Sequence, residues 1–272
     1  MNAIELKQRL NDGGTVFGCI LSAVGNTRWK GAFAGSGLDY VVIDSEHGSR
    51  DRTEIQTLCA MFREIDIMPI VRVPAPMSHY VAMALDAGAA GILVPYCETV
   101  EEVAETVGTA HWHPLKGEYL RQATQGVFPS PRTKEYLENR RRESFVIIGI
   151  ESEPGQRNLD KILEVPGIDA IFIGPNDMTT SLGIPDETKN PKYLDVIRDV
   201  VKRSEARNVP VMVHHQNVEV SLASIEIGSR FVLHSTDGRF MQTAMQEQFA
   251  TLRKAASGGA AAPAARDTIE TV

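Results

Sequence analysis

Short, nearly continuous apolar runs alternate with longer amphipathic stretches along most of the chain. Strands buried on both faces show this uninterrupted hydrophobicity, whereas half-exposed strands alternate apolar and polar residues. The apolar runs cover residues 16–21, 40–43, 69–73, 92–94, 145–150, 170–173, 209–213 and 231–233. Helical periodicity between them falls at residues 52–63, 79–87, 99–110, 158–164, 191–207 and 218–227. The pattern predicts a series of strand–helix units.

A weak internal repeat supports this organisation. Four segments, which begin at Gly37, Gly88, Gly167 and Gly228, place a glycine shortly before an apolar run. Glycine at the end of a helix adopts the left-handed conformation that other residues resist. Repeated units of this kind favour a TIM (β/α)8 barrel over an open sheet. No GxGxxG sequence follows the first run to indicate a Rossmann fold.

The barrel pattern covers most of the chain, so we expect residues 1–256 to form one domain. Residues 111–142 interrupt the rhythm with three prolines and two glycines. We expect them to form an insertion in a strand-to-helix loop at the mouth of the barrel, where long loops often bind ligands. Residues 257–272 are of low complexity and are expected to form a flexible tail.

Composition narrows the class of protein. The net charge of −7 leaves no excess of cations to neutralise phosphates, which argues against nucleic-acid binding. No apolar run approaches the ~18 residues of a membrane span, and no signal peptide is evident. Three widely spaced cysteines without a CxxC motif argue against a disulfide framework or a cysteine-bound zinc. We therefore expect a cytoplasmic protein that acts on small molecules.

Several predicted strands end in polar residues that chemistry could use. In a TIM barrel the carboxyl ends of the strands meet at one mouth, where active sites lie. These strand-end residues are Asp44, Ser45, Glu46, His47, Arg72, Glu151, Asn176, Asp177, His214, His215, His234, Ser235 and Asp237. The lysines Lys30, Lys116, Lys161 and Lys202 fall in loop or helix segments instead, which argues against a lysine imine.

Glu151 and Asp177 are the natural pair of ligands for Mg²⁺ or Mn²⁺, since such cations take carboxylate oxygens plus water and substrate. A rim ion pair of Glu151 with Arg157, or an N-cap role for Asp177, would be the structural alternatives. Arg72 suits a carboxylate or enolate oxygen, and a structural ion pair is its alternative.

His47 follows two carboxylates, Asp44 and Glu46. A carboxylate that is hydrogen-bonded to imidazole fixes the tautomer and raises its basicity, as a general base requires. The alternative is a turn histidine capped by neighbouring acids.

Four motifs and the pair Glu98-Thr99 together resemble the HpcH/HpaI aldolase family, the metal-dependent class II 2-keto acid aldolases that use pyruvate as nucleophile. The motifs are GLDYVVIDSEHG at 37–48, PIVRVP at 69–74, LDAGAAGILVP at 85–95 and IESEPGQRNLDKILEVPGIDAIFIGPNDMTTSLG at 150–183. The similarity runs over roughly residues 14–250, apart from much of 112–143 and the tail.

The resemblance implies a role for each matching residue. His47 matches the catalytic base, Arg72 the pyruvate-binding arginine, and Glu151 and Asp177 the metal ligands. Asp44 would support His47, and Asp86 matches an acid that reaches the site of a neighbouring subunit. The backbone at Gly174, Pro175, Asn176 and Asp177 would hold the pyruvate carboxylate. The family also implies a hexamer whose subunits exchange their last helix, here expected at 237–255.

The implied reaction joins or cleaves a carbon–carbon bond between a pyruvate-type enolate and an aldehyde, with Mg²⁺, Mn²⁺ or Co²⁺ as cofactor. Another enolate reaction, such as oxaloacetate decarboxylation or a macrophomate-synthase-like condensation, would use the same site. A non-catalytic keto-acid-binding barrel is the alternative outside enzymes. Departures from the family at Gly48, Gly149, residues 112–143 and 234–237 lie around the aldehyde end and leave the aldehyde open.

Overall fold

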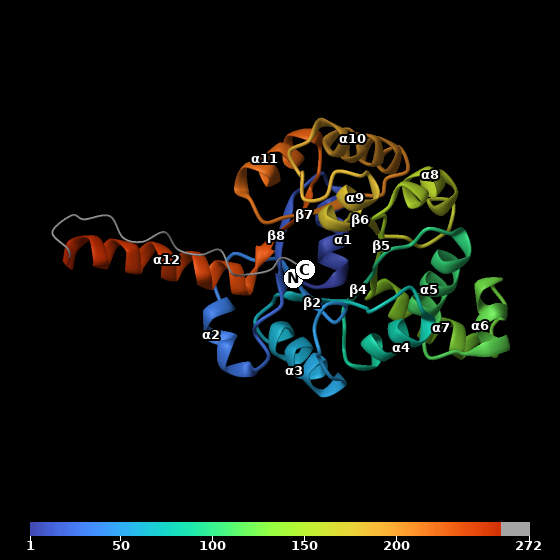
Figure 1. Cartoon of the computed structure of the whole chain (residues 1–272). Coiled ribbons are helices and arrows are strands. Elements are labelled where there is room, and N and C mark those ends of the chain that lie inside the picture. The colour runs from blue at the N-terminus through green and yellow to red at the C-terminus, as the bar shows by residue number, and fades with distance from the viewer. Residues whose placement is uncertain (257–272) are drawn as a thin grey trace.

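The computed structural model describes residues 1–256 and contains a closed barrel of eight parallel strands, which confirms the predicted TIM (β/α)8 fold. The strands lie at the centre, and helices surround them (Figure 1). Each strand pairs with the next along the chain, and β8 pairs with β1 to close the barrel. The strands are β1 (Val16–Leu21), β2 (Tyr40–Asp44), β3 (Met68–Arg72), β4 (Gly91–Val94), β5 (Phe145–Gly149), β6 (Ala170–Ile173), β7 (Val211–His215) and β8 (Phe231–Thr236).

The helices follow the strands along the chain, with one helix before β1 and additional ones in two connections. They are α1 (Ala3–Asn11), the 3₁₀ turn η1 (Thr27–Trp29), α2 (Lys30–Phe33), α3 (Arg52–Arg63), α4 (Ser78–Asp86), α5 (Val100–Trp112), α6 (Gly117–Thr124), α7 (Pro131–Arg142), α8 (Glu153–Ile162), α9 (Pro175–Ser181), α10 (Pro191–Glu205), α11 (Val218–Ile227) and α12 (Asp237–Ala256). None of these described helices is long and apolar enough to cross a membrane.

Two apolar layers hold the barrel together. Side chains that point inward, among them Tyr40, Phe172 and Phe231, fill its interior, and outward ones pack under the helices. The hydroxyl of Tyr40 donates a hydrogen bond of 2.6 Å to the carbonyl of Val232, so the buried phenol is paired. Burial of each large apolar side chain contributes about 1.5–3 kcal/mol, which makes this core the main source of stability.

Helix α1 closes the amino-terminal end of the barrel. Asn2 and Glu5 form a reciprocal capping box that fixes the start of the helix. Ala3, Leu6 and Leu10 then pack against the interior cluster from below. Because this end is covered, a ligand has access only from the opposite end, where the strands terminate.

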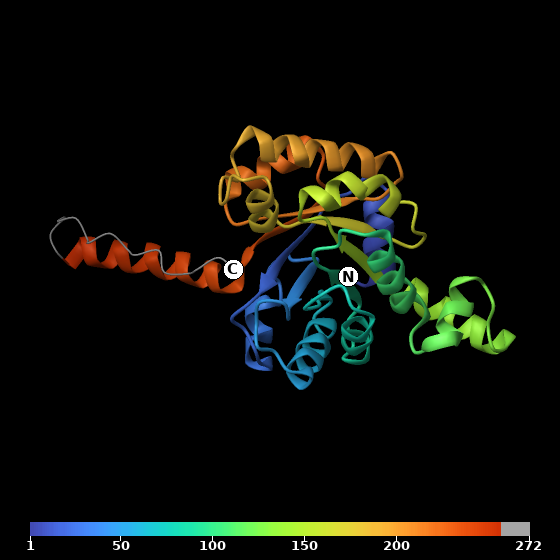
Figure 2. The ribbon, with the colours of Figure 1, turned by 45° about the vertical axis from the view of Figure 1, so that its right-hand side comes forward.

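The predicted position of the insertion at 111–142 is wrong. The segment does not follow a strand: it forms the end of α5 and then α6 and α7, and it leads into the start of β5. Connections from helix to strand lie at the amino-terminal end of a barrel, away from the mouth. Figure 2 shows these helices projecting from the barrel, and residues of α1 and α7 line a common cavity.

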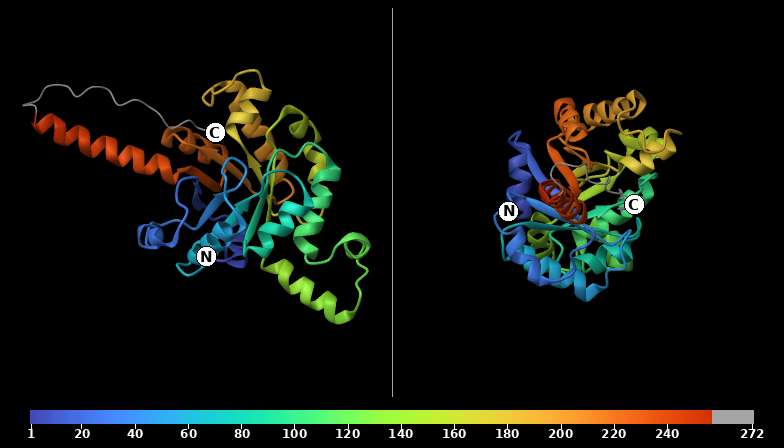
Figure 3. Two further views of the ribbon diagram at one scale, coloured as in Figure 1. Left: turned by 60° about the horizontal axis from the view of Figure 1, so that its bottom comes forward. Right: turned by 60° about the vertical axis from the view of Figure 1, so that its left-hand side comes forward.

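Helix α12 leaves the barrel after β8 and extends away from it, as Figures 1 and 3 show from several directions. Its first residue, Asp237, is buried, whereas Phe240, Met245, Phe249 and Leu252 are exposed. The segment expected to be a flexible tail, residues 257–272, lies outside the described residues.

Candidate active site

The mouth of the barrel is lined by the last inward-pointing residue of several strands. Alternate residues of a strand face the same side, so residues two positions beyond the interior cluster also point inward. Val42, Ile70, Ile147, Phe172 and Met212 belong to that cluster. The inward positions at the mouth are therefore Asp44, Arg72, Gly149, Gly174 and His214.

Arg72 and Asp44 form a buried, doubly hydrogen-bonded pair. Arg72 Nε donates to Asp44 Oδ1 at 2.9 Å, and Nη2 donates to Oδ2 at 2.6 Å. Burial opposes both charges, but this pairing outweighs it, so the pKa of Asp44 is lowered and the pKa of Arg72 is raised. Both groups stay ionised at neutral pH. The expected support of His47 by Asp44 stays a prediction: the charge of Asp44 acts to raise the pKa of His47, while its oxygens accept hydrogen bonds from Arg72 and from the backbone N–H of Glu46.

Glu46 connects this pair to His47. Its Oε2 lies 3.1 Å from Arg72 Nη1 and 3.5 Å from His47 Nε2. Burial raises the pKa of Glu46 to about 7, against the charge of Arg72 and with the help of Asp44 and Asp177. Glu46 is thus the nearer to His47 of the two carboxylates that precede it in the sequence.

The side chain of His47 lies at the rim and is 29% exposed. Burial and then the positive charge of Arg72 lower its pKa, while Asp44 and Asp177 act in the opposite direction. The imidazole is therefore neutral at pH 7, the form that accepts a proton.

Glu151 lies two residues after β5 and is buried. Its Oε1 accepts a 2.9 Å hydrogen bond from the backbone N–H of Tyr96. Burial nevertheless raises its pKa to about 8, with the Tyr96 bond and Arg72 opposing the rise and Glu46 and Asp177 adding to it. Among the described residues no ion pair joins Glu151 to Arg157, which removes the rim-pair alternative.

Two glycines make room for the Glu151 carboxylate. A Cβ atom on Gly149 would lie 2.5 Å from Oε1, and one on Gly174 would overlap Oε2. The glycine at 149, which departs from the family pattern, thus has a steric reason in this chain. Glycines that cradle a buried carboxylate allow it to face the open mouth.

Asp177 lies in the first turn of α9, whose N-cap is Gly174. The N-cap alternative for Asp177 is therefore wrong. Its charge acts on Glu46, His47 and Glu151, which places it near all three. Asp177 and Glu151 together fit a divalent cation, because a buried acid with a raised pKa gains most from a positive charge beside it. Within residues 1–256 no group of three or more His, Cys, Asp or Glu could share a metal, so other ligands would have to come from water and substrate.

Several candidates face away from the mouth. His215 Nε2 is 2.9 Å from Ser224 Oγ, and His234 Nδ1 is 2.9 Å from Ser221 Oγ, both on α11. Asp86, at the end of α4, contacts His113 Nε2 at 2.8 Å, and its side chain is exposed. Within one chain Asp86 is therefore not part of the mouth.

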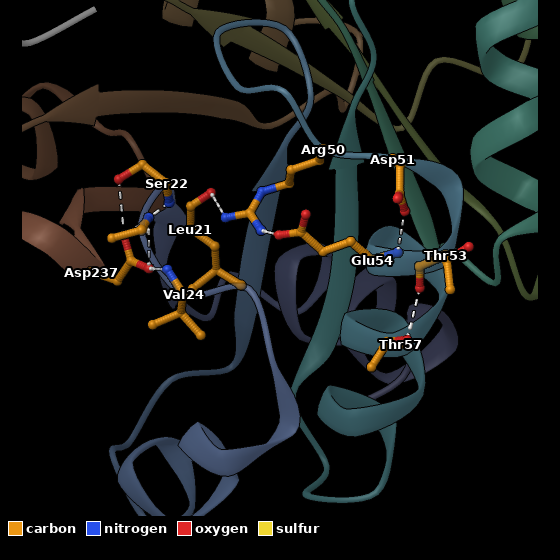
Figure 4. Close-up of polar contacts among 10 residues, drawn as sticks. Leu21, Ser22, Val24, Arg50, Asp51, Thr53, Glu54, Thr57 and Asp237 are labelled. Carbon is orange, nitrogen blue, oxygen red and sulfur yellow. Dashed lines mark hydrogen bonds and ion pairs between the residues drawn. The ribbon is translucent and has the colours of Figure 1, made fainter.

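Asp237 has a structural role. Its carboxylate accepts backbone N–H groups of Ser22, Ala23 and Val24, at 2.7 Å for Val24, and so fixes the loop after β1 (Figure 4). Beside it, Arg50 bonds the carbonyl of Leu21. These contacts explain why an aspartate follows the last strand here.

No lysine is present in any of the eight described strands. Lys30, Lys161 and Lys202 lie in helices α2, α8 and α10, and Lys116 is the N-cap of α6, as the sequence predicts.

The chain is similar to known proteins over most of its length. The family model described as HpcH/HpaI aldolase/citrate lyase matches residues 24–239. The hydroxypyruvate/pyruvate aldolase of Roseobacter denitrificans is 29% identical over 231 residues, 85% of this chain and 90% of that protein. The 2-keto-3-deoxy-L-rhamnonate aldolase of Klebsiella pneumoniae is 31% identical over 209 residues, 76% and 78% of the two chains. The crystal structure of an HpcH/HpaI aldolase from Desulfitobacterium hafniense aligns with a TM-score of 0.79 at 27% identity, over 92% of this chain and 96% of that one.

Proposed function

This chain belongs to the HpcH/HpaI aldolase/citrate lyase family, and we propose that it is a metal-dependent carbon–carbon lyase. It would join or cleave the bond between the enolate of pyruvate, or of a related 2-oxo acid, and an aldehyde. The observation that carries the proposal is the convergence of Arg72, His47, Glu151 and Asp177 at one mouth. The two aldolase relatives reported above support the reaction type.

Glu151 and Asp177 would hold the cation, for which Mg²⁺, Mn²⁺ and Co²⁺ are the candidates. When bound, a divalent cation acts as a Lewis acid that polarises the keto group and so acidifies the adjacent methyl group. The raised pKa of Glu151 and the space left by Gly149 and Gly174 support this assignment.

The side chains at the mouth would share the remaining work. Arg72, held rigidly by Asp44, offers N–H groups to the oxygen on which negative charge develops. The backbone from Gly174 to Asp177 would receive the carboxylate of the 2-oxo acid. His47 would take the methyl proton when the enolate forms, and the hydroxyl proton at C4 when the bond is cleaved.

We infer that the functional form is a homo-oligomer, with a hexamer as the specific expectation and the cytoplasm as its location. The exposed apolar residues of α12 support an exchange of this helix between subunits. In such an assembly Asp86 would lie near the mouth of a neighbouring subunit.

The test is product formation from pyruvate and a short aldehyde, followed by NMR. We expect a 4-hydroxy-2-oxo acid in the presence of Mg²⁺ or Mn²⁺, and no covalent pyruvate adduct after treatment with borohydride. An adduct would indicate a lysine imine and contradict the proposal. Release of CO₂ from oxaloacetate without any aldol product would favour the decarboxylase alternative.

A further inference from the structure

His214, near the end of β7, carries a buried nitrogen to which nothing in the described part of the chain is hydrogen-bonded. The residue is 9% exposed, and its Nε2 has no hydrogen-bond partner. Its side chain points into the barrel, because Met212 on the same face of β7 belongs to the interior cluster. Buried polar atoms are nearly always paired, so an unpaired one at a mouth indicates a missing ligand.

The tautomer of His214 follows from its neighbour on β8. The backbone of Ser235 acts to raise the pKa of the ring, as a carbonyl that accepts from a ring N–H does. Since Nε2 is unpaired, the donor is Nδ1. In the neutral imidazole, Nε2 then carries a lone pair and acts as an acceptor.

The partner strand is irregular at this point. Ser235 has a positive φ of 60°, and the register between β1 and β8 shifts beside it. Non-glycine residues in this conformation are strained, and irregular strand positions often reorient groups next to active sites.

The imidazole is neutral at physiological pH. Burial, followed by the charge of Arg72, lowers the pKa of His214 to about 3. A histidine of this kind is a poor general base at pH 7. It is also an unsuitable partner for a carboxylate, which needs a donor. A hydroxyl group is the substrate group that matches a neutral acceptor.

A cavity of about 290 Å³ adjoins the His214 side chain. His214 lines it together with Asn176, Thr188, Asn217 and Arg239. Asn176 belongs to the segment proposed to hold the 2-oxo acid, whereas Arg239 lies at the start of α12. The lining includes neither Arg72 nor Glu151, so the cavity extends from the proposed 2-oxo acid site toward a separate, polar region.

We propose that Nε2 of His214 accepts a hydrogen bond from a hydroxyl group of the acceptor aldehyde, and that the enzyme therefore prefers hydroxylated aldehydes. This inference rests on the aldolase function proposed above. A metal ligand is a weaker assignment, because no group of three metal-binding side chains occurs among residues 1–256.

The experiment compares glycolaldehyde with acetaldehyde, which differ by one hydroxyl group, as acceptors for pyruvate. The measured quantity is the ratio of the two kcat/KM values for each protein, because a general loss of activity cancels in a ratio. We expect the wild type to prefer glycolaldehyde and His214→Leu to lower the ratio roughly threefold to tenfold, the effect of one hydrogen bond between uncharged groups. His214→Gln, which keeps an acceptor, should recover part of the preference.

Ser204→Ala is the matched control. Its Oγ is also buried and unpaired but lies on α10, so the ratio should stay at the wild-type value. An unchanged ratio in His214→Leu would overturn the inference while leaving the aldolase function intact. A change in the preference for hydroxypyruvate over pyruvate, with the aldehyde ratio unchanged, would also overturn the inference, because it would show that Nε2 contacts the 2-oxo acid and not the aldehyde. A wild type that forms no product with any aldehyde would contradict both proposals.

Discussion

Arg72 is the positively charged group that faces the carboxylates at the mouth of the barrel. One buried guanidinium faces Asp44 and Glu46 directly and also acts on Glu151. In the proposed mechanism this group would have both a structural and a catalytic use: its contact with Asp44 fixes its position, and that fixed position would let it stabilise a developing negative charge.

Arg72→Lys keeps the charge but loses the planar fork. If Arg72 stabilises the developing enolate oxygen, the loss should be ~2–4 kcal/mol, typical of one preorganised donor. At ~1.4 kcal/mol per tenfold, the rate should fall roughly 30- to 1,000-fold. Steady-state kinetics measure the fall, and a thermal melt records the structural share. Near-normal turnover with a lowered melting temperature would make Arg72 a purely structural residue.

Substitutions of His47 and of Asp177 should have different effects on metal binding and on proton exchange. His47→Ala removes the base but no proposed ligand, so metal affinity should stay near wild type while proton exchange at the pyruvate methyl falls by the ~10²–10⁴ of a lost general base. Asp177→Ala removes one of the two proposed anionic ligands and should therefore weaken binding of the metal. Titration calorimetry on both variants, run beside the exchange assay, decides the matter. Loss of the metal in His47→Ala and its retention in Asp177→Ala would reverse the two roles.

The acidity of Glu151 predicts how metal affinity depends on pH. Its pKa rises from 4.5 to about 8 in the metal-free fold, so below pH 8 a cation must displace a proton. Apparent affinity should rise as pH increases from 6 to 8 and then level off. The metal-free fold should also lose stability over the window from 4.5 to 8, because it binds more protons there than the unfolded chain. Calorimetry at several pH values in two buffers would detect the released proton; a flat affinity profile would contradict the assignment.

At this scale the sequence predicts which residues reach the mouth better than it predicts their partners. His47, Arg72, Glu151 and Asp177 each end a strand or follow one, and topology alone brings them together. The pairing of Asp44 with Arg72 depends on two strands in register, and the orphaned Nε2 of His214 depends on an irregular β8. Neither relation is visible in a local motif.

Helices were predictable from the sequence where a local pattern, such as helical periodicity or a capping box, determines them. The helix expected at 52–63 is α3, and Thr99 and Glu102 form the capping box that starts α5. The insertion at 111–142 was misplaced because proline and glycine suggested a loop. In the structure such residues lie at helix ends: Pro131, for example, lies in the first turn of α7. The helix predicted to end at residue 110 continues to Trp112 as α5.

The exposed apolar face of helix α12 leads to a testable prediction. Met245, Phe249 and Leu252 follow an i, i+4, i+7 spacing and are 53–62% exposed, so one face of the helix needs cover. Phe249→Ser should shift the assembly toward smaller species in sedimentation velocity. Glu247→Ser, on the opposite face, is the control and should leave the distribution unchanged. A wild type that sediments as a monomer would contradict the exchange of α12.

The whole molecule is a barrel closed below by α1 and open at the other end, where acids, an arginine and a histidine from separate strands meet. The fold was predictable because most strands are buried on both faces and therefore show a nearly continuous apolar run. The proposed assembly rests on a different kind of evidence, the exposed apolar residues of α12, which nothing in the described part of the chain covers.

The most direct test of the central claim is hydrogen–deuterium exchange at the methyl group of pyruvate, measured by NMR in D₂O without any aldehyde. This reaction needs only the metal, Arg72 and His47, so it isolates enolate formation from the choice of acceptor. We predict exchange in the presence of Mg²⁺ or Mn²⁺, its loss after EDTA, and its return when the metal is restored. Exchange that persists undiminished in EDTA would contradict the proposed role of Glu151 and Asp177, and with it the account of this site.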